Sequence, residues 1–186
     1  RRKRQLFPAG AFKIVLLFLP LLLLVSAMTG SQWDEFSDWL ITPRLLLETG
    51  SFPTTNNAHL AGSLAAYPYG WHYVSYLASL LASRFLENAG ALINIFMLMT
   101  FSLVVIRFIR TGLGHKQDAS TPEWSFCAIA GLSTTLLNTT FAQKVVLTSY
   151  ADLATATITG LSTVVGWQML GALADNKRKE AFHNAL

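Results

Sequence analysis

Charged side chains are scarce in this chain of 186 residues, where Asp, Glu, Lys and Arg together make up 13% against roughly 25% in average soluble domains. Cysteine is nearly absent, and the single Cys127 excludes both an intramolecular disulfide and a thiolate-clustered metal site. The four histidines show no HExxH or HxxxH spacing, and no repeat or low-complexity tract is present. What is abundant is hydrophobic residues, at 52%, and this balance favours an integral membrane protein over a soluble domain.

Four apolar runs approach or reach the roughly 20 residues that a helix needs to cross the hydrocarbon core. They cover 11–28, 91–109, 124–141 and 153–173. The sequence therefore predicts an all-α integral membrane protein with about four transmembrane helices, and with interfacial helices in a long outer loop, 29–90. We expect one transmembrane domain, 1–186, that forms the N-terminal part of a longer polypeptide.

A fifth segment, 68–86, is ambiguous. One helical face carries His72, Ser75, Ser79 and Ser83, and the opposite face is apolar. This division is typical of a helix that lies in the membrane interface. The alternative is that 68–86 crosses the membrane as a fifth transmembrane helix.

The distribution of basic residues separates these alternatives, because cytoplasmic loops are enriched in Lys and Arg. With four spans, ten of the 14 basic residues lie on the inner side, three lie outside, and Lys13 is at the inner edge. With five spans the two sides carry seven each. The four-span arrangement is favoured, and it places the loops 29–90 and 142–152 on the same outer face. The excess of positive charge thus orients the protein in a membrane, and nucleic acid is not an expected partner.

The outer loop begins with two predicted short helices. Ser31 is a candidate N-cap of the first, which places Trp33 and Phe36 on one face and Asp34 on another. The second is predicted over 43–49, with Thr42 as N-cap and Pro43 as its first residue. Gly50 follows as the glycine that ends this helix.

Three acidic residues at the membrane boundary are candidate catalytic groups. Asp34 and Glu35 follow the first span directly, and Asp152 stands at the start of the last. Acids in the first turn of a helix also stabilise its positive end, which is the simpler interpretation. The aromatic residues around 67–72 form either a membrane belt or part of a site. His59 and His72 are interpreted as structural.

Short motifs along the chain occur in a characteristic order. A basic N-terminus and a first span are followed by Trp33-Asp34-Glu35, then by Tyr67-Pro68-Tyr69-Gly70, and finally by Tyr150-Ala151-Asp152. This order resembles the N-terminal part of the GT-C membrane glycosyltransferases, the superfamily of protein O-mannosyltransferases and lipid A aminoarabinose transferases. Members often have a double proline where this chain has Tyr69 and Gly70 after Pro68.

The resemblance implies an inverting enzyme of the bacterial inner membrane, active in the cell envelope. Such an enzyme moves a sugar from a polyprenyl-phosphate donor to an acceptor hydroxyl on the periplasmic or exterior face. It further implies that Asp34 is the candidate base, that Glu35 is its partner, and that Asp152 is the second acid. The candidate substrate-binding residues are the outer basic side chains and two tyrosines, namely Arg44, Tyr67, Arg84, Lys144 and Tyr150.

No cofactor is firmly indicated. Hard divalent cations prefer carboxylate ligands, so Asp34 and Asp152 are candidates for sharing one. Two alternatives stay open for the function. One is a non-catalytic transporter or lipid-binding component of envelope polysaccharide assembly, and the other is a ligase that uses a lipid-diphosphate donor.

Overall fold

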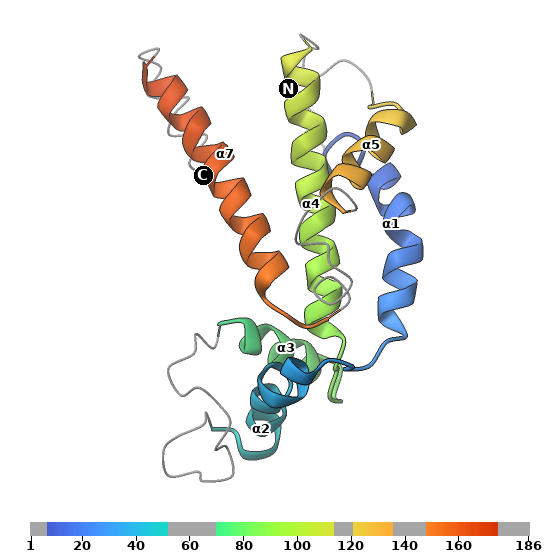
Figure 1. Cartoon of the computed structure of the whole chain (residues 1–186), viewed down its shortest axis with the longest axis vertical. Helices are drawn as coiled ribbons and strands as arrows, with labels where there is room; N and C mark the ends of the chain where they lie inside the picture. The colour runs from blue at the N-terminus through green and yellow to red at the C-terminus, as the bar shows by residue number, and fades with distance from the viewer. Residues whose placement is uncertain (1–6, 52–69, 114–120, 136–147, 175–186) are drawn as a thin grey trace.

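A computed structural model describes residues 7–51, 70–113, 121–135 and 148–174, which are helical or irregular and contain no strand. The helices are α1 (Ala11–Ser26), the π-helical turn η1 (Glu35–Trp39), α2 (Ile41–Thr49), α3 (Gly70–Leu81), α4 (Ala89–Gly112), α5 (Trp124–Thr134) and α7 (Asp152–Ala174). The predicted all-α class is confirmed. Figure 1 shows α2 and α3 gathered at one end of the longer helices.

The long helix α4 is the centre of the fold, because α1, α3, α5 and α7 all pack against it. Its buried residues Ile95 and Leu98 join Ile14 of α1, Cys127 of α5 and Leu153 of α7 in one apolar core. Pro122, just before α5, accepts a 2.6 Å hydrogen bond from Lys13 near the start of α1. Consequently α1 and α5 start at one end of the molecule, whereas α2 and α3 lie at the other (Figure 1).

One helix in the described ranges, α4, is long and apolar enough to cross a membrane. Half of its most apolar stretch of 18 residues is buried within the protein. Helices α1, with 16 residues, and α5, with 11, are apolar but shorter. Helix α7 has 23 residues but contains several threonines, so that it is less apolar than α4. The structure thus bears out one apolar spanning candidate, and the number of four spans stays a prediction.

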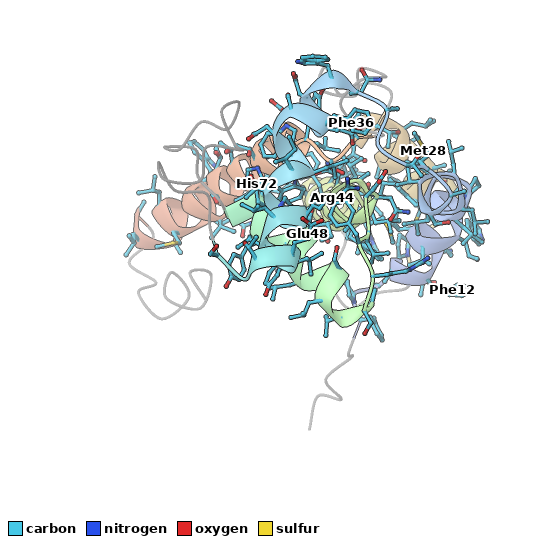
Figure 2. The ribbon with its side chains drawn as sticks, turned by 90° about the horizontal axis from the view of Figure 1, so that it is seen from below. Phe12, Met28, Phe36, Arg44, Glu48 and His72 are labelled. Atoms are coloured by element: carbon cyan, nitrogen blue, oxygen red, sulfur yellow. The ribbon has the colours of Figure 1, made fainter. Side chains whose placement is uncertain are left out.

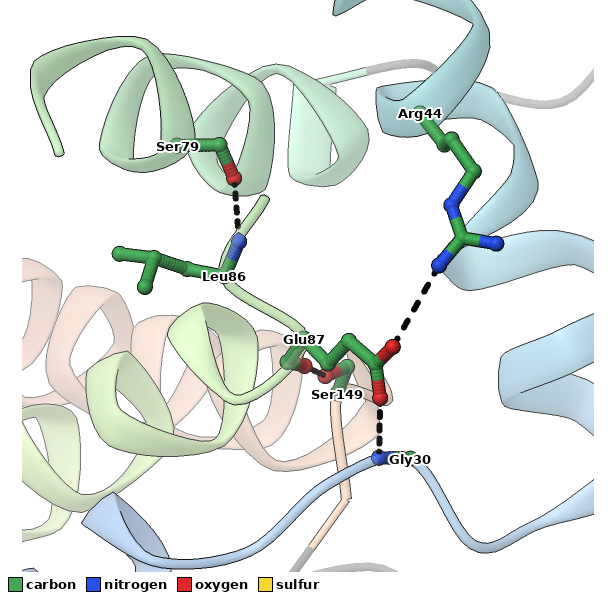
Figure 3. A network of polar contacts seen from close by, with 6 residues as sticks. All are labelled: Gly30, Arg44, Ser79, Leu86, Glu87 and Ser149. Atoms are coloured by element: carbon green, nitrogen blue, oxygen red, sulfur yellow. Dashed lines mark hydrogen bonds and ion pairs between the residues drawn. The ribbon is translucent and has the colours of Figure 1, made fainter. Parts of the chain in front are cut away.

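Helix α3 has a polar and an apolar face as predicted, but its polar face points into the protein, and Ser83, predicted for the same face, lies beyond the end of the helix at Leu81 and is exposed. His72, Ser75 and Ser79 are at most 2% exposed, whereas Leu81 is 88% exposed. The Ser79 hydroxyl donates to the Ser75 carbonyl and accepts the Leu86 N–H at 3.0 Å (Figure 3). Interfacial helices normally keep the polar face in water. Here the small serines instead let α3 pack closely against α2 and α4.

The starts of the two short helices differ from the prediction. Ser31 does not cap through its hydroxyl, because its N–H donates to the Glu35 carboxylate instead. Helix α2 begins at Ile41 with no side-chain cap, and the Thr42 hydroxyl is buried with no hydrogen-bond partner in the described chain. Pro43 still lies in the first turn, where proline is tolerated. The predicted end at Gly50 is confirmed, with φ of 67° in the left-handed region.

Helix α7 contacts the protein mainly through its first half. Leu153, Ala154 and Thr157 are buried, and Gly160 faces the Phe101 ring. Further along, Trp167 is 73% exposed and nothing lies near Gly166. The small-residue spacing at 156–166 predicts a helix packed against protein. Among those residues Gly160 lies against Phe101, whereas Ala156 and Ser162 are exposed, and beyond them Ala172 is buried.

Candidate functional site

The turn η1 gives two adjacent acids opposite environments. Asp34 is exposed, whereas Glu35 is 2% exposed. Trp33 and Phe36 on either side are 82% and 52% exposed. Asp34 is therefore accessible to a ligand, and Glu35 is not.

The Glu35 carboxylate joins two segments that are far apart in the sequence. One oxygen accepts the N–H groups of Ser31 at 2.8 Å and Gln32 at 3.1 Å. The other accepts the Ser149 N–H at 2.7 Å. Backbone N–H groups buried without a partner are costly, and hydrogen bonds to charged acceptors are the stronger kind. Glu35 therefore holds these two backbone segments together and is not open to a ligand beside Asp34.

The N–H, the carbonyl and the hydroxyl of Ser149 are all hydrogen-bonded at this end of the molecule. The indole N–H of Trp71 donates to its carbonyl at 2.7 Å, and its hydroxyl donates to the Glu87 carbonyl at 2.8 Å (Figure 3). A Cβ at Gly90 would stand 3.0 Å from the Ser149 Cα, so the start of α4 approaches this backbone closely because residue 90 is glycine. The segment before α7 is thus fixed against η1, α3 and α4.

The fixed segment brings Tyr150 to Asp34. Burial raises the Tyr150 pKa above its ordinary value near 10, and the negative charges of Asp34 and Glu35 raise it further, while the Asp34 backbone partly offsets this. A tyrosine with a raised pKa is a neutral donor at physiological pH. The bond from Ser149 to Glu35 thus brings Asp34 and Tyr150, two candidate residues predicted from separate loops, to the same end of the molecule as chain neighbours of its two partners.

A second acid of η1 contacts a histidine that sequence reasoning did not select. The His72 Nε2 lies 3.6 Å from Asp38 Oδ2, and its ring stacks on Trp39 with centroids 5.1 Å apart. Trp39 also contacts Tyr150, at 6.3 Å between ring centroids. The available signal was that His72 shares its helix face with Ser75 and Ser79, and this face turns out to be the buried one.

Burial lowers the pKa of His72 below its ordinary 6.5, and the nearby Asp38 carboxylate only partly offsets this. Because the folded pKa is the lower one, the stabilisation is complete above pH 6.5 and is lost as the pH falls through the folded pKa. We expect the melting temperature of the wild type to fall more steeply between pH 7 and 5 than that of His72→Phe, which keeps the ring but not the titration. Differential scanning fluorimetry in detergent measures both, and equal slopes would contradict the assignment.

The predicted basic residues are only partly near this site. Arg44 of α2 is half exposed, lies 3.4 Å from Glu87 and stacks on the Phe85 ring, whereas Arg84 is exposed. Figure 2 looks onto this end, with Phe36, Arg44 and Glu48 along η1 and α2 and His72 on α3. The Glu87 carboxylate also accepts the Gly30 N–H at 3.0 Å (Figure 3), so Arg44 is linked to the start of the loop. Tyr67 and Lys144 lie outside the described residues, as does His59.

Asp152 is exposed in the first turn of α7, where a carboxylate stabilises the positive end of the helix. In the described ranges no three His, Cys, Asp or Glu side chains are grouped so that they could hold a metal ion. A divalent cation shared by Asp34 and Asp152 stays a prediction.

Comparison with known proteins gives no guide to the function. No protein family, no curated protein and no solved structure matches the chain. The likeness to GT-C enzymes therefore stays a prediction, and the function must be argued from the residues at this end of the molecule.

Proposed function

We propose that the chain belongs to a membrane glycosyltransferase of the GT-C type, with its site on the outer face. The observation that carries the proposal is the exposed Asp34 carboxylate beside the bond from Ser149 to Glu35, which joins segments more than a hundred residues apart. A carboxylate that is open to a ligand is suited to act as a general base.

The four-span topology is part of this proposal. In the described chain helix α3 has 12 residues and α5 has 11, so both are shorter than the roughly 30 Å of hydrocarbon at 1.5 Å per residue, and the topology rests on sidedness instead of on length. The contacts of Glu35 and Trp71 with Ser149 hold the long outer loop and the start of α7 at one end. Large apolar side chains such as Leu23, Phe96 and Ile129 are exposed, and lipid would cover them.

The proposed step is a single displacement. The oxygen of an acceptor hydroxyl forms a bond to the anomeric carbon as the bond from that carbon to the phosphate oxygen of the carrier breaks. The proton of the hydroxyl passes to Asp34, and the bonding electron pair leaves with the lipid phosphate. Attack opposite the leaving group inverts the anomeric centre. Asp34 suits the base role because it is exposed, while neighbouring Glu35 already accepts three N–H groups.

The leaving phosphate needs positive charge close by. Arg44 supports this part of the proposal because its guanidinium is half exposed at the same end as Asp34 and is fixed by Glu87 and Phe85. Arg84 is exposed beside Phe85 in the chain. Together with Tyr67 and Lys144, these residues are the proposed phosphate and headgroup contacts.

The test is transfer of labelled sugar in membranes that contain the full-length protein. We expect transfer from a polyprenyl-monophosphate sugar and little from the matching diphosphate, because the proposed leaving group is a monophosphate. Efficient use of the diphosphate alone would favour the ligase alternative. Tight binding of polyprenyl phosphate with no turnover of either donor would overturn the enzyme and support a lipid-binding component, which the exposed apolar face of α3 would also suit.

A further inference from the structure

The segment 148–150 is held by two neutral side chains that no catalytic hypothesis includes. The Asn94 amide of α4 donates to the Tyr150 carbonyl at 2.8 Å and to the Thr148 carbonyl at 3.3 Å. The Trp71 indole of α3 donates to the Ser149 carbonyl between them, at 2.7 Å. Two helices thus hold three consecutive carbonyls of a segment that has no helix of its own.

The hydrogen bonds of Asn94 fix the backbone on both sides of Ser149. Asn94 is fully buried in the apolar helix α4, where an amide is costly to bury unless its N–H groups are used. Both of its N–H bonds go to residues that flank Ser149, and neither goes to its own helix. The arrangement therefore sets the backbone position of Tyr150, and with it the place from which the phenol reaches Asp34.

We propose that Trp71 and Asn94 are positioning residues that hold Tyr150 beside Asp34, because the Ser149 N–H next to Tyr150 donates to Glu35 next to Asp34, and that they thereby set the surroundings of the base. Trp39 contacts the Tyr150 ring and limits its movement. The role in catalysis rests on the proposed function, whereas the effect of the two donors on Tyr150 does not.

The experiment uses Trp71→Phe in the full-length protein, because this change removes one N–H donor and no charge. The readout is the titration of Tyr150, followed by NMR of ¹³Cζ-labelled tyrosine and assigned with Tyr150→Phe. In the wild type we expect the midpoint above 10, because burial and the charge of Asp34 disfavour the phenolate. In Trp71→Phe we expect it to move down towards 10, as it should in Asp34→Asn. Trp167→Phe, at an exposed tryptophan of α7, is the matched control and should leave it unchanged.

A second variant guards against misfolding. Asn94→Ala removes the other donor, and only variants that keep the wild-type circular dichroism spectrum are compared. An unchanged Tyr150 midpoint in the folded variants would overturn the proposal. If the midpoint moves, kcat for sugar transfer should fall by about tenfold or more with little change in KM. A shifted midpoint in a protein whose wild type transfers no sugar would support the positioning of Tyr150 and overturn the transferase.

Discussion

Glu35→Gln should lower the free energy of unfolding by about 3 kcal/mol, since hydrogen bonds to a charged acceptor are worth about 1.5–3 kcal/mol each. The amide keeps one acceptor oxygen. Its NH₂ group, however, faces backbone N–H groups that donate hydrogen bonds to the carboxylate in the wild type. If the oxygen stays on Ser149, the N–H groups of Ser31 and Gln32 lose their partner. Unfolding in mild detergent, followed by tryptophan fluorescence, measures the loss.

The control for this prediction is Glu48→Gln. Glu48 is an exposed acid of α2, and surface substitutions of this kind usually change stability by no more than about 0.5 kcal/mol. If Glu35→Gln were as stable as Glu48→Gln, the carboxylate would not be joining the outer loop to Ser149.

Asp34→Asn should lower kcat for sugar transfer by about 10²- to 10⁴-fold, the usual contribution of a general base. The amide has nearly the same shape, but it cannot take the proton of the attacking hydroxyl. Because Asp34 is exposed, the variant should keep the wild-type melting temperature, so the loss is one of chemistry and not of folding.

Glu48→Gln is again the matched control and should transfer sugar at the wild-type rate, since Glu48 is an exposed acid further along the same loop. Activity of Asp34→Asn within a few-fold of the wild type would show that Asp34 is not the base. A large loss in both variants would indicate that charge at this face matters in general, and would contradict a specific role for Asp34.

Much of the architecture could be predicted because it follows from local periodicity. The apolar run 91–109 lies within α4, and Gly50 ends α2 because glycine readily adopts a positive φ. The start of α2 could not be predicted, because Thr42 is buried by packing and so does not serve as the cap that its residue type indicates.

Of the site, the sequence predicted only which loops lie on the same side of the membrane. The four-span arrangement placed Asp34 and Tyr150 on one face, and in the structure their chain neighbours Glu35 and Ser149 are hydrogen-bonded. The role of Glu35 could not be predicted, since its partners are backbone N–H groups, which every residue except proline carries. The contact of α4 with the segment 148–150 could have been predicted from Asn94, because an amide in an apolar run needs a hydrogen-bonding partner elsewhere in the protein.

Labelling from each side of the membrane tests the central claim most directly, that the outer loop and the start of α7 form one site on the outer face. Cys127 is replaced by serine, and single cysteines are introduced at positions 34, 116 and 152 of the full-length protein. An impermeant maleimide added outside should label positions 34 and 152 in intact cells, and position 116 only after the membrane is opened. Labelling of 34 from outside with 152 reached only from inside would contradict the account.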